Sequence, residues 1–373
     1  MSNEKPLYVT QPTLPTLEEF LPYLERIWQT KVLTNCGPFH QELEQALADY
    51  LGVKHVSLFS NGTNALLVAL QALGISGEVI TTPYSFVATA NSLLWRGIAP
   101  VFVDIDPVTL NLDPARIETA ITPRTTAIMP VHCYGHPCDV EGIGAIAKAR
   151  KLRVIYDAAH AFAVRNSSAS ILEFGDLSVL SFHATKVFNT FEGGAIVSHD
   201  ADTKKHIDQL RNFGFETETT VVSAGINSKM SEFNAALGLV QLKGLEEAVR
   251  RRKAIARRYR DGLARVQGIE CVAETTRWTP NHAYFPVMVT PDFPLARDAL
   301  YEKLRESNIY GRRYFYPLIS DFPMYTALPS AAHANLPVAR TAAARVLCLP
   351  MSANMEIADA DRVIARVAEA RGA

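Results

Sequence analysis

Short apolar runs alternate with amphipathic stretches along the chain up to about residue 212. Helices are predicted where apolar residues recur every three or four positions, at 18–28, 39–51, 63–73, 88–95, 139–151 and 201–212. Strands are predicted where aliphatic and β-branched residues cluster, at 55–59, 78–82, 100–104, 126–131, 153–157, 177–182 and 195–198. Strands that alternate with helices and are apolar on both faces indicate an α/β fold with a mostly parallel sheet.

The pattern changes at about residue 228. A long helical stretch at 228–266, interrupted at Gly244, is followed by a strand at 284–290, a helix at 295–307 and a last helix at 357–370. We therefore predict a large α/β domain with an N-terminal helical segment at 1–245 and a smaller α+β domain at 246–373. Seven basic residues between Arg250 and Arg260 alternate with apolar ones, which indicates a solvated helical face rather than a polyanion site.

Composition narrows the class of protein. The 373 residues are 48% hydrophobic and 20% charged, as in a globular protein and unlike a disordered one. A net charge of −1 does not indicate a protein that binds nucleic acid or an anionic membrane. Residues 1–11 lack the apolar core of a signal peptide, and five scattered cysteines do not form a disulfide framework. These features predict a cytoplasmic protein.

One local cluster of residues could suggest a metal site. His132, Cys133, His136 and Cys138 lie within seven residues of one another. A closed zinc site usually draws its four ligands from two separated pairs, whereas these residues surround a turn after the strand at 126–131. We therefore predict that they form a strand end entering a turn and bind no metal.

Three groups of polar residues follow predicted strands. The loop at 60–64, SNGTN, joins a strand to a helix, and its glycine, hydroxyls and helix N-terminus suit a phosphate. Asp157 ends another strand, and Lys186 follows a third, close to Ser181 and other hydroxyls. Each group by itself has an ordinary explanation, since hydroxyls and Asp157 could cap helices and a lysine after a strand is usually on the surface.

Taken together, the three groups indicate a cofactor. Ligands of open α/β sheets bind at the carboxyl ends of the strands, where all three groups are expected. A phosphate cup, a carboxylate that keeps a pyridine nitrogen protonated and a lysine that binds an aldehyde carbon predict pyridoxal phosphate. A nicotinamide dehydrogenase would need a glycine-rich turn after its first strand, and this loop has one glycine only.

Longer motifs reveal a resemblance to a known family. In chain order, SNGTNA, PYSFVATANS, VFVDIDP, YDAAHA, SFHATKVFNTFEGGA and GINSKMSEFNAALGLVQL resemble the sugar aminotransferases of the DegT/DnrJ/EryC1/StrS family. The resemblance runs from the TNCGP turn to the GRRYFYPL segment, nearly the whole chain. It implies the aspartate aminotransferase-like fold of fold-type-I enzymes, with a seven-stranded central sheet, and a homodimer with shared active sites.

The resemblance also implies roles for single residues. Lys186 matches the lysine that binds the cofactor and acts as acid and base, and Asp157 matches the partner of the pyridine nitrogen, so both are predicted to be catalytic. Phe86 matches an aromatic that stacks on the pyridine ring, with a core phenylalanine as the alternative. The remaining predicted cofactor contacts are His160 at the ring oxygen, Gly62, Thr63 and Ser181 at the phosphate, and Asn227 at the phosphate of the neighbouring subunit.

Two segments point to a subgroup of the family. The opening TQPTLPTLEEFLPYLERIW and the KVFNTFEGG after the lysine are most similar to members that transfer an amino group from glutamate to C4 of dTDP-4-keto-6-deoxyglucose, for O-antigen or other glycan biosynthesis. Amination at C3 of a dTDP-3-keto-6-deoxyhexose and amination of a UDP-4-keto sugar stay open.

Lys186 argues against two other functions: relatives that remove a hydroxyl carry histidine in its place, and a non-catalytic binding protein would have no use for the whole set of groups. One departure is Lys229, where many relatives carry arginine. The substrate residues predicted for the nucleotide-sugar end, with an amphipathic strand as the alternative explanation, are Arg312, Arg313, Tyr314 and Tyr316.

Overall fold

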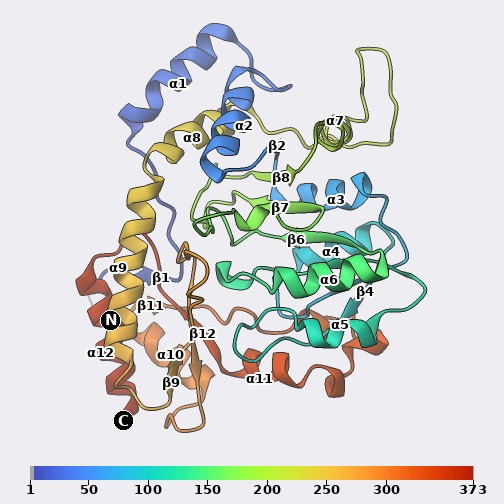
Figure 1. Ribbon diagram of the computed structural model, residues 1–373. Coiled ribbons are helices and arrows are strands. Elements are labelled where there is room, and N and C mark those ends of the chain that lie inside the picture. The colour runs from blue at the N-terminus through green and yellow to red at the C-terminus, as the bar shows by residue number, and fades with distance from the viewer. Residues whose placement is uncertain (1–3, 373) are drawn as a thin grey trace.

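The computed structural model describes residues 4–372, so residues 1–3 and 373, the outermost positions of the two predicted domains, lie outside the described residues. At its centre is a seven-stranded sheet in the order β2-β8-β7-β6-β5-β3-β4 (Figure 1). The strands are β2 (His55–Phe59), β3 (Glu78–Thr81), β4 (Ala99–Phe102), β5 (Thr125–Met129), β6 (Arg153–Asp157), β7 (Leu177–Ser181) and β8 (Gly194–Ser198). β8 is antiparallel to both of its neighbours, and the other pairings in this sheet are parallel. The predicted mostly parallel seven-stranded sheet is confirmed.

Helices cover both faces of this sheet because side chains of a strand alternate between the faces. On β6, Val154 and Tyr156 join one hydrophobic cluster, whereas Ile155 joins the other. The first cluster takes in α2 (Pro38–Leu51) and α6 (Val140–Arg150), and the second takes in α3 (Gly62–Ala72) and α7 (Ala201–Leu210). Of the remaining helices in this part, α4 (Ala88–Trp95) contacts β4, α5 (Pro114–Ala120) contacts α6, and α1 (Leu17–Thr30) contacts α8 (Glu232–Lys243).

The long predicted helix is two helices, α8 (Glu232–Lys243) and α9 (Leu245–Leu263), which meet at Gly244 as expected. It begins at residue 232 rather than 228 because the side chain of Ser231 accepts a hydrogen bond from the amide of Asn234 and caps the helix. Six of the seven basic residues predicted to form a solvated face are at least partly exposed, and Arg252 of α9 is the exception. This side chain is buried, and its Nη1 faces the carbonyl oxygens of three residues of other segments, His282, Ala283 and Met351, at 3.3–3.4 Å.

A second sheet lies towards the C-terminus. It has the order β12-β10-β9, with β9 (Ile269–Cys271), β10 (Phe285–Val289) and β12 (Val346–Leu349). It shares a hydrophobic cluster with α9, α10 (Arg297–Glu306) and α12 (Ile357–Arg371). The N-terminal strand β1 (Leu7–Tyr8) joins this part by pairing in parallel with β11 (Ile309–Tyr310).

The sequence did not predict β9, β12, α5 or α11 (Pro337–Arg345). Short 3₁₀ turns occur at Cys133–Gly135, Ile171–Glu173, Ile319–Asp321, Pro329–Ala331 and His333–Asn335. Phe315, Leu318 and Ala339 pack into the core of the large sheet although they belong to the C-terminal segment. The division at residue 245 stays a prediction.

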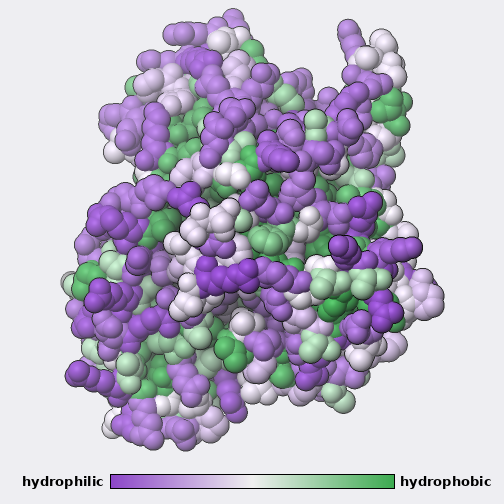
Figure 2. All heavy atoms as spheres, in the orientation of Figure 1, coloured by the Kyte–Doolittle hydropathy of each residue, from purple (hydrophilic) through white to green (hydrophobic). Residues whose placement is uncertain are grey.

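Polar side chains cover most of the molecular face in Figure 2, and hydrophobic ones show only in scattered patches between them. Among residues 4–372, no helix combines the length and the apolar character needed to cross a membrane.

Candidate active site

A cavity of about 540 Å³ opens at the carboxyl ends of β6 and β7, beside the N-terminus of α3. This is the edge of the sheet at which ligands of open α/β folds bind. Eight of the predicted site residues line it: Gly62, Thr63, Phe86, Asp157, His160, Ser181, Lys186 and Tyr314. The strand ends therefore bring together side chains that are far apart in the sequence.

The first turn of α3, which follows β2, forms part of the cavity wall. The side chain of Asn61 caps the helix by accepting a hydrogen bond from the amide of Asn64 at 2.8 Å. The amides of Gly62 and Thr63 belong to the first turn, where a helix offers no internal acceptor. A Cβ on Gly62 would lie 3.0 Å from Cβ of Ser181, so the absence of a side chain lets this turn approach β7. The result is a group of backbone and hydroxyl donors suited to an anion.

Asp157 ends β6 and is 5% exposed. Its Oδ2 accepts a hydrogen bond from Oγ1 of Thr89 at 2.7 Å, and its Oδ1 accepts one from the amide of Ala159 at 3.1 Å. Oγ1 of Thr89 lies 2.9 Å from Oγ of Ser85, a residue of the cavity wall. Burial raises the pKa of Asp157, and the hydrogen bond from Thr89 and the charge of Lys186 oppose that rise. The carboxylate is thus held in place by two donors.

Lys186 lines the same cavity as Asp157 and interacts with it electrostatically. Burial lowers the pKa of Lys186 to about 8, although the negative charge of Asp157 works in the opposite direction. Its Nζ also lies 5.9 Å from the centre of the Tyr284 ring. An amine that titrates this close to neutral pH can both accept and donate a proton, as a general acid and base must.

His160 is 7% exposed and lines the cavity. Its Nδ1 accepts a hydrogen bond from the amide of Tyr134 at 3.2 Å. Burial, reinforced by the positive charge of Lys186, holds the pKa of His160 well below its usual value. The ring is therefore neutral with its proton on Nε2, which can donate to a ligand.

Phe86 is 57% exposed where its ring borders the cavity, which does not fit the alternative of a core phenylalanine. Sequence reasoning missed several wall residues. Tyr284 comes from the C-terminal segment, and nothing in its local sequence marks it. Phe315 lies within the GRRYFYPL segment, between the predicted Tyr314 and Tyr316. Ser85 and Thr89 lie within the PYSFVATANS motif, so the motif already contained the signal for them.

Four predicted residues lie outside the cavity wall. Asn227 is exposed, and its backbone bridges to Asn212. Arg312 is exposed, with its guanidinium 5.9 Å from the Tyr314 ring. Nη1 of Arg313 donates to Oδ1 of Asp298 at 2.9 Å, and the exposed ring of Tyr316 lies beside that guanidinium.

The His132 cluster lies in the turn after β5. The ring of His132 stacks on Tyr156, and its Nδ1 accepts a hydrogen bond from the amide of Cys138 at 3.0 Å. In the part of the chain that the structure describes, no group of three or more histidine, cysteine and acidic side chains is arranged to hold a metal ion.

Comparison with known proteins identifies the family. A model of the DegT/DnrJ/EryC1/StrS aminotransferase family matches residues 16–368. The chain belongs to this family. It is 54% identical over 366 residues to a dTDP-4-amino-4,6-dideoxy-D-glucose transaminase of Shigella dysenteriae, covering 98% of this chain and 99% of that one. It is 36% identical to a GDP-perosamine synthase of Caulobacter vibrioides, covering 92% and 93%. The crystal structure of DesI in the presence of its TDP-sugar product matches with a TM-score of 0.93 at 36% identity, covering 99% of this chain and 94% of that one.

As a member of the DegT/DnrJ/EryC1/StrS family, the protein is a pyridoxal phosphate-dependent aminotransferase. The residues present fit that cofactor. The α3 turn supplies donors for a phosphate, the buried carboxylate of Asp157 suits a protonated ring nitrogen, and the amine of Lys186 suits an aldehyde carbon. Lys229, the departure from many relatives, donates from Nζ to Oδ1 of Asn212 at 2.6 Å and does not line the cavity.

Proposed function

We propose that the protein transfers the amino group of L-glutamate to C4 of dTDP-4-keto-6-deoxy-D-glucose, giving dTDP-4-amino-4,6-dideoxy-D-glucose and 2-oxoglutarate. The observation that supports this substrate is the near full-length similarity to the transaminase of Shigella dysenteriae. We further propose that the reaction takes place in the cytoplasm, which agrees with five unpaired cysteines, and that its product serves O-antigen or other glycan biosynthesis.

In this proposal the chain binds and orients the cofactor. Pyridoxal phosphate, when bound, supplies an electron-poor ring that stabilises negative charge on the carbon that loses a proton. Asp157 holds the ring nitrogen in its protonated form through a buried, hydrogen-bonded carboxylate. Phe86 stacks on the ring, and Nε2–H of His160 donates to the ring oxygen. The phosphate is bound by Gly62, Thr63 and Ser181, which line the same end of the cavity.

Lys186 is the proposed acid and base. Lys186 would accept the proton from the α-carbon of glutamate and deliver a proton to the carbon that was the cofactor's aldehyde, and the reverse transfers would aminate the sugar. The pKa of about 8 supports this role because the free amine changes protonation near physiological pH. Tyr284 places its ring beside the amine, and Phe315 adds a further aromatic side chain to the cavity wall.

The nucleotide-sugar end is assigned to the segment after β11. Tyr314 lines the cavity, so we propose that it contacts the sugar. The exposed guanidinium of Arg312 beside the Tyr314 ring suits a diphosphate. Arg313 and Tyr316, which lie further out, are proposed to contact the nucleotide.

The substrate is tested with purified protein, glutamate and a panel of keto sugars. We expect amination of dTDP-4-keto-6-deoxyglucose, with the amino group located at C4 by NMR and 2-oxoglutarate formed in equal amount. The 3-keto dTDP isomer and a UDP-4-keto sugar serve as competitors at equal concentration. Preferential amination of either competitor would replace the proposed substrate while leaving the aminotransferase chemistry intact.

We also propose a homodimer in which Asn227 reaches the phosphate bound by the other subunit. Asn227 is exposed and does not line the cavity of its own chain. Exposed apolar side chains that could form the interface lie nearby in sequence and on α1. They are Phe213 (47% exposed), Val221 (57%), Ile226 (39%), Leu17 (67%) and Trp28 (71%).

Mixing two inactive variants tests the shared site. Lys186→Ala and Asn227→Asp are expected to be inactive alone, the second because it places a negative charge beside a phosphate. After subunit exchange, about half of the dimers are mixed, and each mixed dimer has one site with neither substitution. We therefore expect about a quarter of the wild-type activity per total site. If native mass spectrometry shows mixed dimers and no activity returns, Asn227 does not act across the interface.

A further inference from the structure

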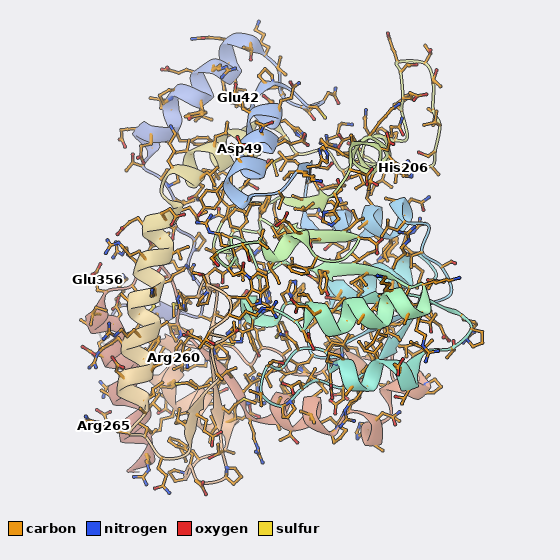
Figure 3. The ribbon with its side chains drawn as sticks, in the orientation of Figure 1. Glu42, Asp49, His206, Arg260, Arg265 and Glu356 are labelled. Carbon is orange, nitrogen blue, oxygen red and sulfur yellow. The ribbon has the colours of Figure 1, made fainter. Side chains whose placement is uncertain are left out.

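A second cluster of ionisable side chains lies outside the active-site cavity, where the turn before α2 meets the end of α7. Both helices contact β2 and lie at the same end of the molecule in Figure 3. The figure labels Glu42 and Asp49 on α2 and His206 on α7. The cluster consists of Cys36, His40, Glu44 and Arg211. The other charged groups that face it are Lys204, Asp208 and Lys229.

The thiol of Cys36 has two cationic neighbours. Nη2 of Arg211 donates to Sγ of Cys36 at 3.7 Å. The second is His40, which interacts electrostatically with Cys36, is fully buried, and has its Nε2 3.1 Å from Oε1 of Glu44. Nδ1 of His40 has no geometrically complete hydrogen bond in the described structure, and because Glu44 takes Nε2, it is the nitrogen left for Cys36.

These contacts fix the charges of the cluster. Burial opposes charge on His40, but the interactions with Cys36 and Glu44 outweigh it and raise the pKa of the ring to about 9. Burial likewise opposes the thiolate, and the interaction with His40 together with the charge of Arg211 outweighs it, so the pKa of Cys36 is lowered. The thiolate is the nucleophilic form of cysteine, and Cys36 is only partly buried.

We propose that Cys36 is a modification site, a thiolate that accepts a hydrogen bond from Arg211 beside the buried His40 and reacts with hydroperoxides and alkylating agents, and whose modification weakens cofactor binding. With hydrogen peroxide, the sulfur attacks one oxygen, and an S–O bond forms as the O–O bond breaks. The sulfur is oxidised to a sulfenic acid, and the other oxygen leaves as hydroxide and takes up a proton to give water.

The link to the cofactor runs through β2. Nη1 of Arg211 donates to the carbonyl of Leu58 at 2.9 Å, and Oε1 of Glu44 accepts from the amide of Leu58 at 3.0 Å. Leu58 lies two residues before Ser60, which begins the proposed phosphate loop. The amide of Ser60 donates to the carbonyl of Ser228 at 2.7 Å, and the amide of Ser228 donates to the carbonyl of Arg211 at 3.0 Å. A group added to Cys36 that displaces the guanidinium of Arg211 therefore breaks its hydrogen bond to the carbonyl of Leu58, next to the loop.

The wild-type holoenzyme provides the first test, because its other cysteines are internal controls. Cys271 is also partly buried, but burial raises its pKa, and Cys133, Cys138 and Cys348 are buried. Treated briefly with iodoacetamide at pH 6.5, the protein is expected to be alkylated at Cys36 about tenfold faster than at Cys271, as measured by peptide mass spectrometry. Equal or slower labelling of Cys36 would overturn the proposal.

Variants test whether the charged neighbours of Cys36, rather than the exposure of its thiol alone, make it reactive. His40→Gln removes the cation, so the pH at which Cys36 labelling is half-maximal should rise, whereas Gln45→Ala, on the exposed face of α2, should leave it unchanged. An unchanged pH midpoint in His40→Gln would contradict the assigned role of His40. With peroxide, a sulfenic acid trapped by a 1,3-dione is expected on Cys36 and its absence there would overturn the oxidation step.

The effect on the cofactor is measured by the visible absorbance that remains bound after gel filtration. Alkylated wild-type protein should bind pyridoxal phosphate about tenfold more weakly, because this is the effect of losing one hydrogen bond to a charged group. Cys36→Ser has no thiol at this position, so the same treatment should leave its cofactor affinity unchanged. Equal loss in Cys36→Ser would overturn the link to the loop. None of these readouts uses a sugar, so a wrong substrate assignment would leave them unaffected.

Discussion

Lys186→Ala is expected to yield a colourless protein whose transaminase activity is about 10⁴-fold below that of the wild type. The substitution removes the amine that we assign to covalent cofactor binding and to proton transfer, and general acid–base catalysis alone contributes up to about 10⁴-fold. The wild type is expected to show a yellow chromophore that survives gel filtration. A colourless wild type that takes up no added pyridoxal phosphate would contradict the whole site assignment.

The stability of the same variant can be compared with that of the wild type in the absence of cofactor, as a control for misfolding. In the folded apoprotein the pKa of Lys186 is lowered to about 8 by burial, whereas an unfolded lysine titrates near 10.4. Between these values the unfolded chain binds more protons, so the free energy of unfolding of the wild-type apoprotein should rise with pH. Lys186→Ala should lack that increment and should be no less stable than the wild type at pH 7. A large loss of stability would instead attribute the lost activity to misfolding.

The central sheet could be predicted because its strands are apolar on both faces and are separated by helices with clear periodicity. What local pattern could not give is pairing between distant segments. β1 has two residues and exists only because β11 is beside it. β12, with the sequence VLCL, could equally have been part of a buried helix until it paired with β10. Arg252 shows the same limit, since its buried position depends on carbonyl groups that other segments bring to it.

The candidate site likewise contains residues that the sequence could predict and residues that it could not. Gly62, Asp157 and Lys186 follow strands, and parallel strands end at one edge, so their convergence followed from the sheet itself. Tyr284 reaches the cavity from the second sheet, whose position relative to the first no local pattern encodes. Thr89 is a buried hydroxyl within α4, and its bond to Asp157 joins residues 68 positions apart. Such contacts depend on how α4 packs on the sheet.

Asp157→Asn is expected to lower turnover by about 10²–10⁴-fold while the fold persists. Removing one partner of a buried charged pair costs about 3–5 kcal/mol, which corresponds to that range of rates. The amide keeps the size of the carboxylate, and its single oxygen can still accept the hydrogen bond from the amide of Ala159. Its NH2 group then faces Oγ1 of Thr89, a hydroxyl oxygen that can accept as well as donate. The loss should therefore appear in the turnover number of both half-reactions, with glutamate and with the keto sugar, rather than in the KM of either substrate.

Thr89→Val is the matched test of how Asp157 is held. Valine preserves the volume of this fully buried side chain but removes the hydroxyl that donates to Oδ2. A hydrogen bond to a charged group contributes about 1.5–3 kcal/mol, so turnover should fall about 10- to 100-fold, less than in Asp157→Asn. Without this donor the pKa of Asp157 should rise further, so the pH at which the bound cofactor changes its absorbance should shift, whereas Thr89→Ser should keep the wild-type value. Near-normal turnover in Asp157→Asn would show that the carboxylate is only a structural cap. In that case Thr89→Val should also have near-normal turnover, because Thr89 acts on the cofactor only through Asp157.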